Sequence, residues 1–262
     1  MRKNFTISYD YNAPEYKELR ERYNLQEMAK GTDFEKCQSL LVWVSRKIRH
    51  RGNYDNSDRQ DALTLLALSY QTDYGINCLS LSIVLCECLL AVGIKARVVY
   101  MMPEAAEDGD NHVVVEAFVS EWNKWIVLDA TYGSYCIGED DTILNLGELQ
   151  AYVASGKKYY FSKGINYNGE TNLDLQDIRT YYAKNLFFLR CKSIQGYGAH
   201  REYGHMMEIA PRGFDVHERM VQNLQYRIAT YGECDIFEKW FAYESNLENV
   251  YIDRKDFWEE DD

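Results

Sequence analysis

Apolar residues recur at helical spacing along the stretch that follows Cys78. The repeating positions are Leu81, Val84, Leu85, Cys88, Leu89 and Val92. Ile83 adds an apolar residue on another side, so that the segment is apolar nearly all round. Glu87 is the only charged residue there, and Gly93 suits the position just past a helix end, where a left-handed backbone costs glycine little. The pattern predicts a buried helix that begins at Cys78.

Other segments also carry a helical pattern. Thr32 and Glu35 form a capping box before residues 33–49, where apolar residues keep an i, i+3, i+4, i+7 rhythm. Asp215 and Glu218 make a similar pattern before a segment with Met220, Val221, Leu224 and Ile228 at helical spacing. We also expect helices over residues 15–29, 62–70 and 146–155.

Period-two alternation predicts strands after Gly93. Three of them form an antiparallel meander over residues 94–100, 112–120 and 125–130, with a hairpin turn over residues 121–124. An apolar run at residues 186–189 predicts another strand. Irregular structure is expected over residues 132–141, 156–180 and 193–205. Helices followed by antiparallel strands indicate an α+β fold.

Bulk composition narrows the class of protein. The chain has 262 residues, of which 46% are hydrophobic, enough for one large globular domain or a domain with an extension. A net charge of −12 argues against nucleic acid or an anionic membrane as a partner, because both attract cationic surfaces. No apolar run approaches the ~18 residues of a membrane span.

Cysteine usage and the start of the chain point to a cytoplasmic protein. Seven cysteines without regular spacing are interpreted as reduced thiols, because a disulfide scaffold is usually shorter and evenly counted. Met1 is followed by no apolar run, so no signal peptide is predicted.

We predict no metal and no cofactor. Cys86 and Cys88 point about 200° apart on a helix and cannot share an ion. Cys191, His200 and His205 are expected in a loop without a recognisable ligand spacing. No glycine-rich phosphate loop follows a strand.

Three residues in order suggest nucleophilic chemistry. Cys78 opens the buried helix, where the helix dipole favours a thiolate. His112 opens a strand, and Asp129 closes the next one. Cysteine, histidine and aspartate are the nucleophile, base and orienting group of acyl transfer.

The segments that carry these residues resemble the transglutaminase-like superfamily, in particular its bacterial members described as cysteine proteases. The match covers about residues 60–135 and rests on Gly75-Ile76-Asn77-Cys78, the helix end at residues 89–98, the strand from His112 to Phe118, and Trp125-Ile126-Val127-Leu128-Asp129-Ala130-Thr131-Tyr132-Gly133. The resemblance implies a papain-like core with the cysteine helix packed on an antiparallel sheet. It implies Cys78 as nucleophile, His112 as general base and Asp129 as the orienting residue.

The resemblance also suggests a division of the chain. Residues 1–60 are the helical N-terminal part of the core, residues 61–135 the transglutaminase-like catalytic core, and residues 136–262 a mixed C-terminal extension packed on the same domain. The role of that extension is not readable from the sequence.

The hairpin gives a first estimate of the separation between His112 and Asp129. A turn centred on Trp122 and Asn123 places residue 112 opposite residue 133. His112 and Asp129 then share a face but are offset by four residues, about 13 Å along a strand. A bulge or a register shift is needed to bring them together.

Several further residues are candidates to support the site. The backbone N–H of Cys78 is a natural oxyanion donor, because first-turn amides lack helical partners. Gln71 is the candidate for a second donor, with Tyr70 behind it and an ordinary surface position as the alternative. Asn77 next to the nucleophile, and Trp125 as a cleft-lining or core residue, complete the set. Glu116 is either a supporting or a solvated residue, and His50 is interpreted as a solvated residue at a helix end.

The resulting hypothesis is a thiol hydrolase or acyl transferase that acts on peptide or protein amide bonds through an acyl-enzyme. The alternative is a catalytically silent binding or scaffolding protein with the same fold. Arylamine acyl transfer or removal of N-linked glycans is a third possibility. The acyl donor, the acceptor and the oligomeric state stay open at this stage.

Overall fold

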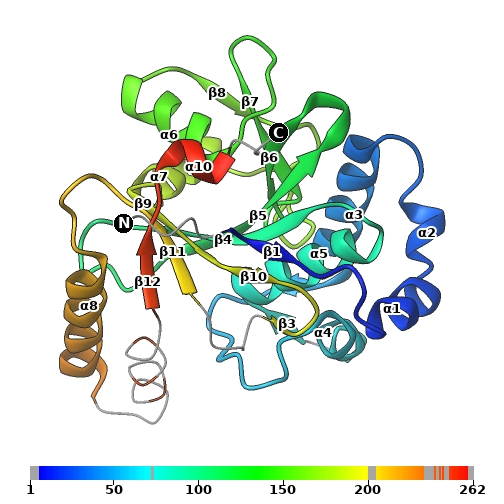
Figure 1. Ribbon diagram of the computed structural model, residues 1–262, viewed down its shortest axis with the longest axis horizontal. Coiled ribbons are helices and arrows are strands. Elements are labelled where there is room, and N and C mark those ends of the chain that lie inside the picture. The colour runs from blue at the N-terminus through cyan, green and yellow to red at the C-terminus, as the bar shows by residue number, and fades with distance from the viewer. Residues whose placement is uncertain are drawn as a thin grey trace.

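A central sheet organises the molecule. The computed structural model describes residues 6–71, 74–199, 205–232 and 248–258, with residues 239, 242 and 244. Eight of the described strands form this sheet (Figure 1), in the order β12 (Glu248–Tyr251), β11 (His205–Ile209), β9 (Phe188–Lys192), β4 (Ala96–Met102), β5 (His112–Val119), β6 (Lys124–Asp129), β7 (Ser134–Gly138) and β8 (Tyr159–Phe161). The predicted α+β class and the β4-β5-β6 meander are confirmed. Only the β11–β12 pair in this sheet is parallel.

The helix that begins at the cysteine lies at the centre of one face of the sheet. In α5 (Cys78–Ala91) every residue from Ser80 to Ala91 is buried. It packs against β4 and β5 and is surrounded by α1 (Glu15–Tyr23), α3 (Asp33–Lys47) and α4 (Ala62–Leu68). Each Leu, Val or Ile side chain buried there contributes about 1.5–3 kcal/mol through removal of apolar surface from water. The most hydrophobic segment of the chain therefore anchors the core.

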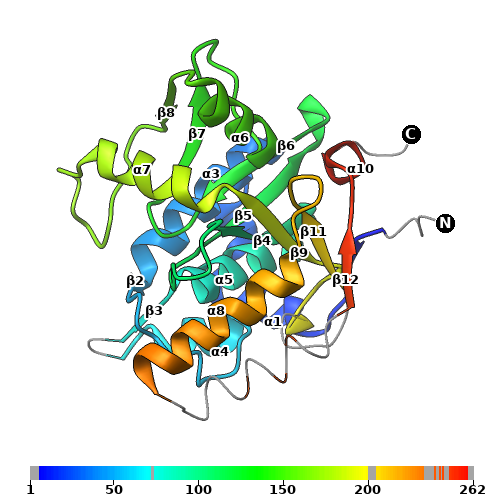
Figure 2. The same cartoon turned by 90° about the vertical axis from the view of Figure 1, so that its left-hand side faces the viewer.

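The C-terminal half covers the other face. Apolar residues of α6 (Leu146–Ser155), α7 (Leu175–Asn185) and α10 (Arg254–Trp258) share a cluster with Val99, Val114 and Val127 of the sheet. Figure 2 shows α6 and α7 on the side of the sheet away from α5. The long α8 (Val216–Tyr231) lies beside the sheet, and β9, β11 and β12 extend the sheet beyond β4.

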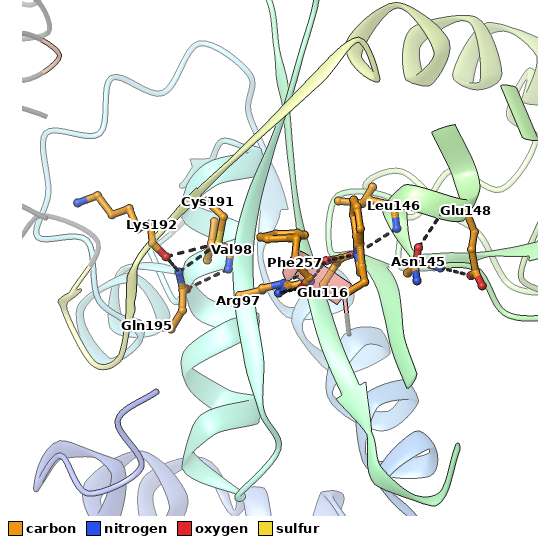
Figure 3. Close-up of polar contacts among 11 residues, drawn as sticks. Arg97, Val98, Glu116, Asn145, Leu146, Glu148, Cys191, Lys192, Gln195 and Phe257 are labelled. Carbon is orange, nitrogen blue, oxygen red and sulfur yellow. Dashed lines mark hydrogen bonds and ion pairs between the residues drawn. The ribbon is translucent and has the colours of Figure 1, made fainter. Parts of the chain in front are cut away.

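A buried ion pair connects the C-terminus to the central strands (Figure 3). Nη2 of Arg97 lies 2.7 Å from Oε2 of Glu116, and both side chains are at most 2% exposed. Glu116 also accepts hydrogen bonds from the backbone N–H of Leu146 and from Nε1 of Trp258, each at 2.8 Å. Arg97 donates to the carbonyl of Phe257 at 2.8 Å. Both sequence interpretations of Glu116 are therefore wrong: it is neither solvated nor at the site, but joins α6 and α10 to the sheet.

Several predicted element boundaries need correction. The helix expected over residues 15–29 is interrupted at Asn24, whose φ of 54° is left-handed, and continues as α2 (Leu25–Met28). The regions expected to be irregular contain β7, β8, α7 and β10 (Ile194–Gln195). Cys191 and His205 lie in strands and not in a loop. His200 and the acidic tail at residues 259–262 lie outside the described residues.

These misses have a common physical cause. The inward-facing residues of β7 are Ser134, Cys136 and Gly138, which are small and give no apolar alternation. The buried positions of α7 are Ile178, Tyr182 and Asn185, of which one is aliphatic. Both elements bury side chains that sequence patterns count as polar. Among the described residues, no helix combines the length and apolarity that a membrane crossing needs.

Candidate active site

Local capping holds Cys78 at the first position of α5. Asn77 is the N-cap residue, and its Oδ1 accepts a hydrogen bond from the backbone N–H of Ser80 at 3.1 Å. Nδ2 of Asn77 donates to the carbonyl of Tyr54 at 3.1 Å, which ties the helix start to the preceding loop. Of the six cysteines that the structure describes, Cys78 alone is partly exposed. The helix N-terminus thus presents this thiol with its backbone amide and a favourable dipole.

The β5–β6 hairpin brings His112 and Asp129 together. Val115 lies opposite Leu128, two residues away from the expected register. The shift arises because the turn covers residues 120–123, one residue earlier than expected, with a 3₁₀ turn η1 (Ser120–Trp122) and a left-handed Asn123 at φ 49°. The same register continued places residue 112 opposite residue 131, which makes His112 and Asp129 diagonal neighbours on one face. Nε2 of His112 lies 2.6 Å from Oδ2 of Asp129.

Hydrogen bonds from three residues hold Asp129 as a carboxylate. Its Oδ2 accepts a hydrogen bond from the hydroxyl of Tyr182 on α7. Its Oδ1 accepts from the backbone N–H of Thr131 at 2.8 Å and of Tyr132 at 3.3 Å. Burial would raise the pKa of Asp129, but the positive charge of His112 and these hydrogen bonds lower it below its ordinary value.

The same contacts couple His112 to the thiol. Because Nε2 of His112 contacts Asp129, Nδ1 is the ring nitrogen left to interact with Cys78. Burial would lower the pKa of His112, but the charge of Asp129 and the hydrogen bonds to Asp129 and Cys78 raise it above its ordinary value. Burial would also raise the pKa of Cys78, but hydrogen bonds to His112 and His50 lower it to about 7. The arrangement favours a thiolate–imidazolium pair near neutral pH.

His50 is a site residue that the sequence interpretation missed. It lies in β2 (Arg49–His50), which pairs in parallel with β3 (Gly75–Ile76), so that His50 lies opposite Ile76 and close to Cys78. Its side chain contributes to lowering the pKa of Cys78. The interpretation as a solvated helix-end residue is therefore wrong. The only sequence signal was a histidine that follows a capped helix, and that signal does not reveal the β2–β3 pairing.

Tyrosines enclose the imidazole of His112. Its ring lies 5.3 Å from the ring of Tyr181, 5.6 Å from Tyr182 and 6.1 Å from Tyr132, measured between centroids. The hydroxyl of Tyr181 donates to the carbonyl of Asn111 at 3.1 Å. These rings exclude water around the His112–Asp129 pair, which strengthens its electrostatic interaction.

The other predicted supporting residues occupy different places. Asn77 is at the site as a helix cap. Gln71 and Tyr70 follow α4 and are exposed, with Tyr70 lying under the ammonium of Lys47. Trp125 is buried near the other end of β6, against Tyr9, Phe118 and the guanidinium of Arg97. Trp125 is thus a core residue remote from Asp129.

Residues of α8 secure the loop that leads into His112. Nη2 of Arg219 donates to the carbonyl of Ala105 at 3.0 Å, and Nδ2 of Asn223 donates to the carbonyls of Ala106 at 2.6 Å and Asp108 at 3.2 Å. Arg227 donates to the carbonyl of Gly109. The C-terminal half therefore contacts the site through α7, and through α8 it holds the loop that leads into His112.

The helix-borne thiol, the His112–Asp129 pair and the antiparallel sheet together define a papain-like, transglutaminase-like fold with the side chains needed for acyl transfer. Residues 22–130 match the family model of the transglutaminase-like superfamily. The resemblance seen in the sequence is confirmed, and the match begins earlier than residue 60. Among the described residues, no group of three or more His, Cys, Asp or Glu side chains is placed to hold a metal ion.

Similarity to individual proteins is low. One solved structure, titled a "putative cysteine protease" from Cytophaga hutchinsonii, shares 17% identity with this chain at a TM-score of 0.34. The similarity covers 50% of this chain and 40% of that one, so the chain spans about two fifths of that protein's length. No curated protein matches the sequence.

Proposed function

We propose that the protein is a cysteine-nucleophile hydrolase or acyl transferase that acts on peptide or protein amide bonds. The observations that carry this proposal are the contact of His112 with Asp129, in which Nε2 lies 2.6 Å from Oδ2, and the lowering of the pKa of Cys78 by His112. Cys78 is the nucleophile, His112 the general acid and base, and Asp129 fixes the tautomer and orientation of His112.

The chemistry follows from the charges at rest. The Cys78 thiolate attacks the carbonyl carbon, a C–S bond forms, and the carbonyl electron pair moves to the oxygen. The backbone N–H of Cys78 stabilises this oxyanion. Collapse breaks the C–N bond while Nδ1 of His112 gives its proton to the departing amine. Water or an amine, deprotonated by the now neutral His112, then attacks the thioester and releases the thiolate.

The thiolate is tested by alkylation of each cysteine with iodoacetamide between pH 5 and pH 9, followed by peptide mass spectrometry. We expect Cys78 to react fastest below pH 7 and His112→Ala to remove that advantage. Cys37 is a matched internal control, because burial raises its pKa to about 12. A Cys78 that reacts like an ordinary thiol would favour the catalytically silent binding protein.

Turnover is tested with two protein substrates. Release of fragments from fluorescein-labelled casein reports hydrolysis, and incorporation of monodansylcadaverine into dimethylcasein reports transamidation. Cys78→Ala should abolish whichever activity is present, and Cys37→Ala should retain it. Equal activity in the Cys78→Ala protein would contradict the proposed mechanism.

A further inference from the structure

A second histidine lies near the thiol and comes from a different part of the chain. β2 carries His50 and runs beside β3, which ends two residues before Cys78. A Cβ added at Gly75 would come within 3.1 Å of the backbone carbonyl oxygen of Arg49, so the absence of a side chain permits this close pairing. The strand pair delivers an imidazole to Cys78 independently of the β5–β6 hairpin.

His50 is fixed in place by a short segment after β8. The side chain of Asn168 holds the backbone of His50 at both ends: Oδ1 accepts from its N–H at 2.7 Å, and Nδ2 donates to its carbonyl at 3.1 Å. Nδ1 of His50 lies 2.9 Å from the hydroxyl of Tyr167, and the two rings are 5.4 Å apart between centroids. Such anchoring is typical of a side chain that must meet a second group at a fixed position.

The contact with Tyr167 determines which nitrogen faces the thiol. With Nδ1 directed at Tyr167, Nε2 is left for Cys78. A thiolate accepts hydrogen bonds and cannot donate one, so Nε2 must carry a proton when it faces the ionised sulfur. His112 already supplies the cation and the proton transfer. His50 is therefore a fixed hydrogen-bond donor beside the reacting sulfur.

We propose that Nε2–H of His50 is the second oxyanion donor of the site and that Tyr167 positions it through its contact with Nδ1. This inference rests on the proposed function. When the C–S bond forms and the carbonyl electron pair moves to oxygen, Nε2–H donates to that oxygen together with the backbone N–H of Cys78. The proton stays on Nε2 throughout, so His50 stabilises charge without exchanging it. Gln71, the candidate from the sequence, is exposed and follows α4 on another segment.

Two reactions of the Cys78 sulfur distinguish stabilisation of an oxyanion by His50 from stabilisation of the resting thiolate. Alkylation by iodoacetamide forms no oxyanion, whereas acylation by p-nitrophenyl acetate passes through one. The p-nitrophenolate leaving group also needs no proton, so the acylation rate does not depend on His112 as a general acid. Both rates are compared at the pH plateau of each variant, where Cys78 is fully ionised, in the full-length protein.

His50→Ala should lower the plateau rate of acylation about 100-fold and change the plateau rate of alkylation by no more than about twofold. His50→Gln, which keeps an N–H donor, should recover at least about tenfold of the lost acylation rate. Tyr167→Phe should lower the plateau rate of acylation about tenfold and change the plateau rate of alkylation by no more than about twofold. His217→Ala on the exposed face of α8 and Tyr160→Phe on β8 are matched controls that should match the wild type in both reactions.

Each contrary result has a distinct meaning. Equal losses in acylation and alkylation would overturn the oxyanion role, and so would wild-type acylation in both His50→Ala and Tyr167→Phe. Because Tyr167→Phe removes one hydroxyl, it keeps the test decisive if His50→Ala fails to fold. If the Cys78→Ala variant were acylated as fast as the wild type, the proposed function itself would be overturned, and the role of His50 with it.

Discussion

Tyr182 donates its hydroxyl hydrogen bond to Oδ2 of Asp129, the same oxygen that lies 2.6 Å from Nε2 of His112. The two residues come from parts of the chain that play different roles, since Asp129 ends a strand of the superfamily core and Tyr182 belongs to α7 of the C-terminal half. The orienting residue of the candidate triad is therefore held by an element outside the family match.

Tyr182→Phe should weaken the site more than the fold. Loss of this hydrogen bond costs about 1–3 kcal/mol, because a charged acceptor is involved. Asp129 should then hold His112 less firmly, and alkylation of Cys78 at pH 7 should fall about threefold or more. Tyr159→Phe is the matched control, because Tyr159 is buried and its hydroxyl has no hydrogen-bond partner among the described residues. A drop of equal size in both variants would contradict this role.

The pH profile of Cys78 should depend on the charge of Asp129. Cys78 has its pKa lowered to about 7, so alkylation of the wild type should rise through pH 7. Asp129→Asn removes the negative charge that raises the pKa of His112, leaving His112 neutral at pH 7 and removing the cation beside the thiol. The midpoint should then move to higher pH by one unit or more, and reactivity at pH 7 should fall about tenfold. An unchanged midpoint, measured by mass spectrometry, would rule out this coupling.

Asn77→Ala should show that the cap of α5 positions Cys78 in addition to stabilising the fold. The variant loses the cap on the Ser80 amide and the bond to the Tyr54 carbonyl, and should be about 1 kcal/mol less stable in urea unfolding. Asn145→Ala removes the capping box of α6 and should cost a similar amount. Only Asn77→Ala should also slow the alkylation of Cys78. If both variants retain full reactivity under native conditions, the cap does not position the thiol.

Asn223→Ala should loosen the loop that precedes His112. The variant removes two hydrogen bonds to the carbonyls of Ala106 and Asp108, each worth about 1 kcal/mol. We expect faster amide hydrogen exchange over residues 103–111 and lower reactivity of Cys78. Gln222→Ala on the exposed side of α8, where Gln222 donates within the helix to Glu218, is the control. Unchanged exchange in the loop would show that α8 does not secure it.

Sequence patterns predicted the parts of the site that lie within strongly periodic elements. Cys78 opens an apolar helix, and His112 and Asp129 bound two alternating strands, so their order and elements were readable. The contact between His112 and Asp129 was not, because the turn lies one residue earlier than the sequence suggests and ends at a left-handed Asn123, which shifts the register by two residues.

The residues that were missed share a different property. His50 and Tyr182 reach the site through pairing and packing over long sequence distances, through β2–β3 and through α7 against the sheet. Two-residue strands have no period to detect, and a helix that buries tyrosine and asparagine resembles a polar loop. Conversely, Trp125 and Glu116 occupy strand positions of the right parity but serve the far end of the sheet.

The position of β9 in the sheet has a consequence for how this protein is made. β9 pairs with the edge of β4 that β5 leaves open, although its residues follow the whole superfamily core in the sequence. A nascent chain therefore carries an unpaired inner strand edge until residues 188–192 leave the ribosome. The apolar face with Val99 and Val114 stays uncovered until α6 and α7 have been made. A fragment cut after residue 135 would keep that edge permanently and present a template for intermolecular pairing. The ribosome must thus deliver much of the C-terminal half before the core is protected from aggregation.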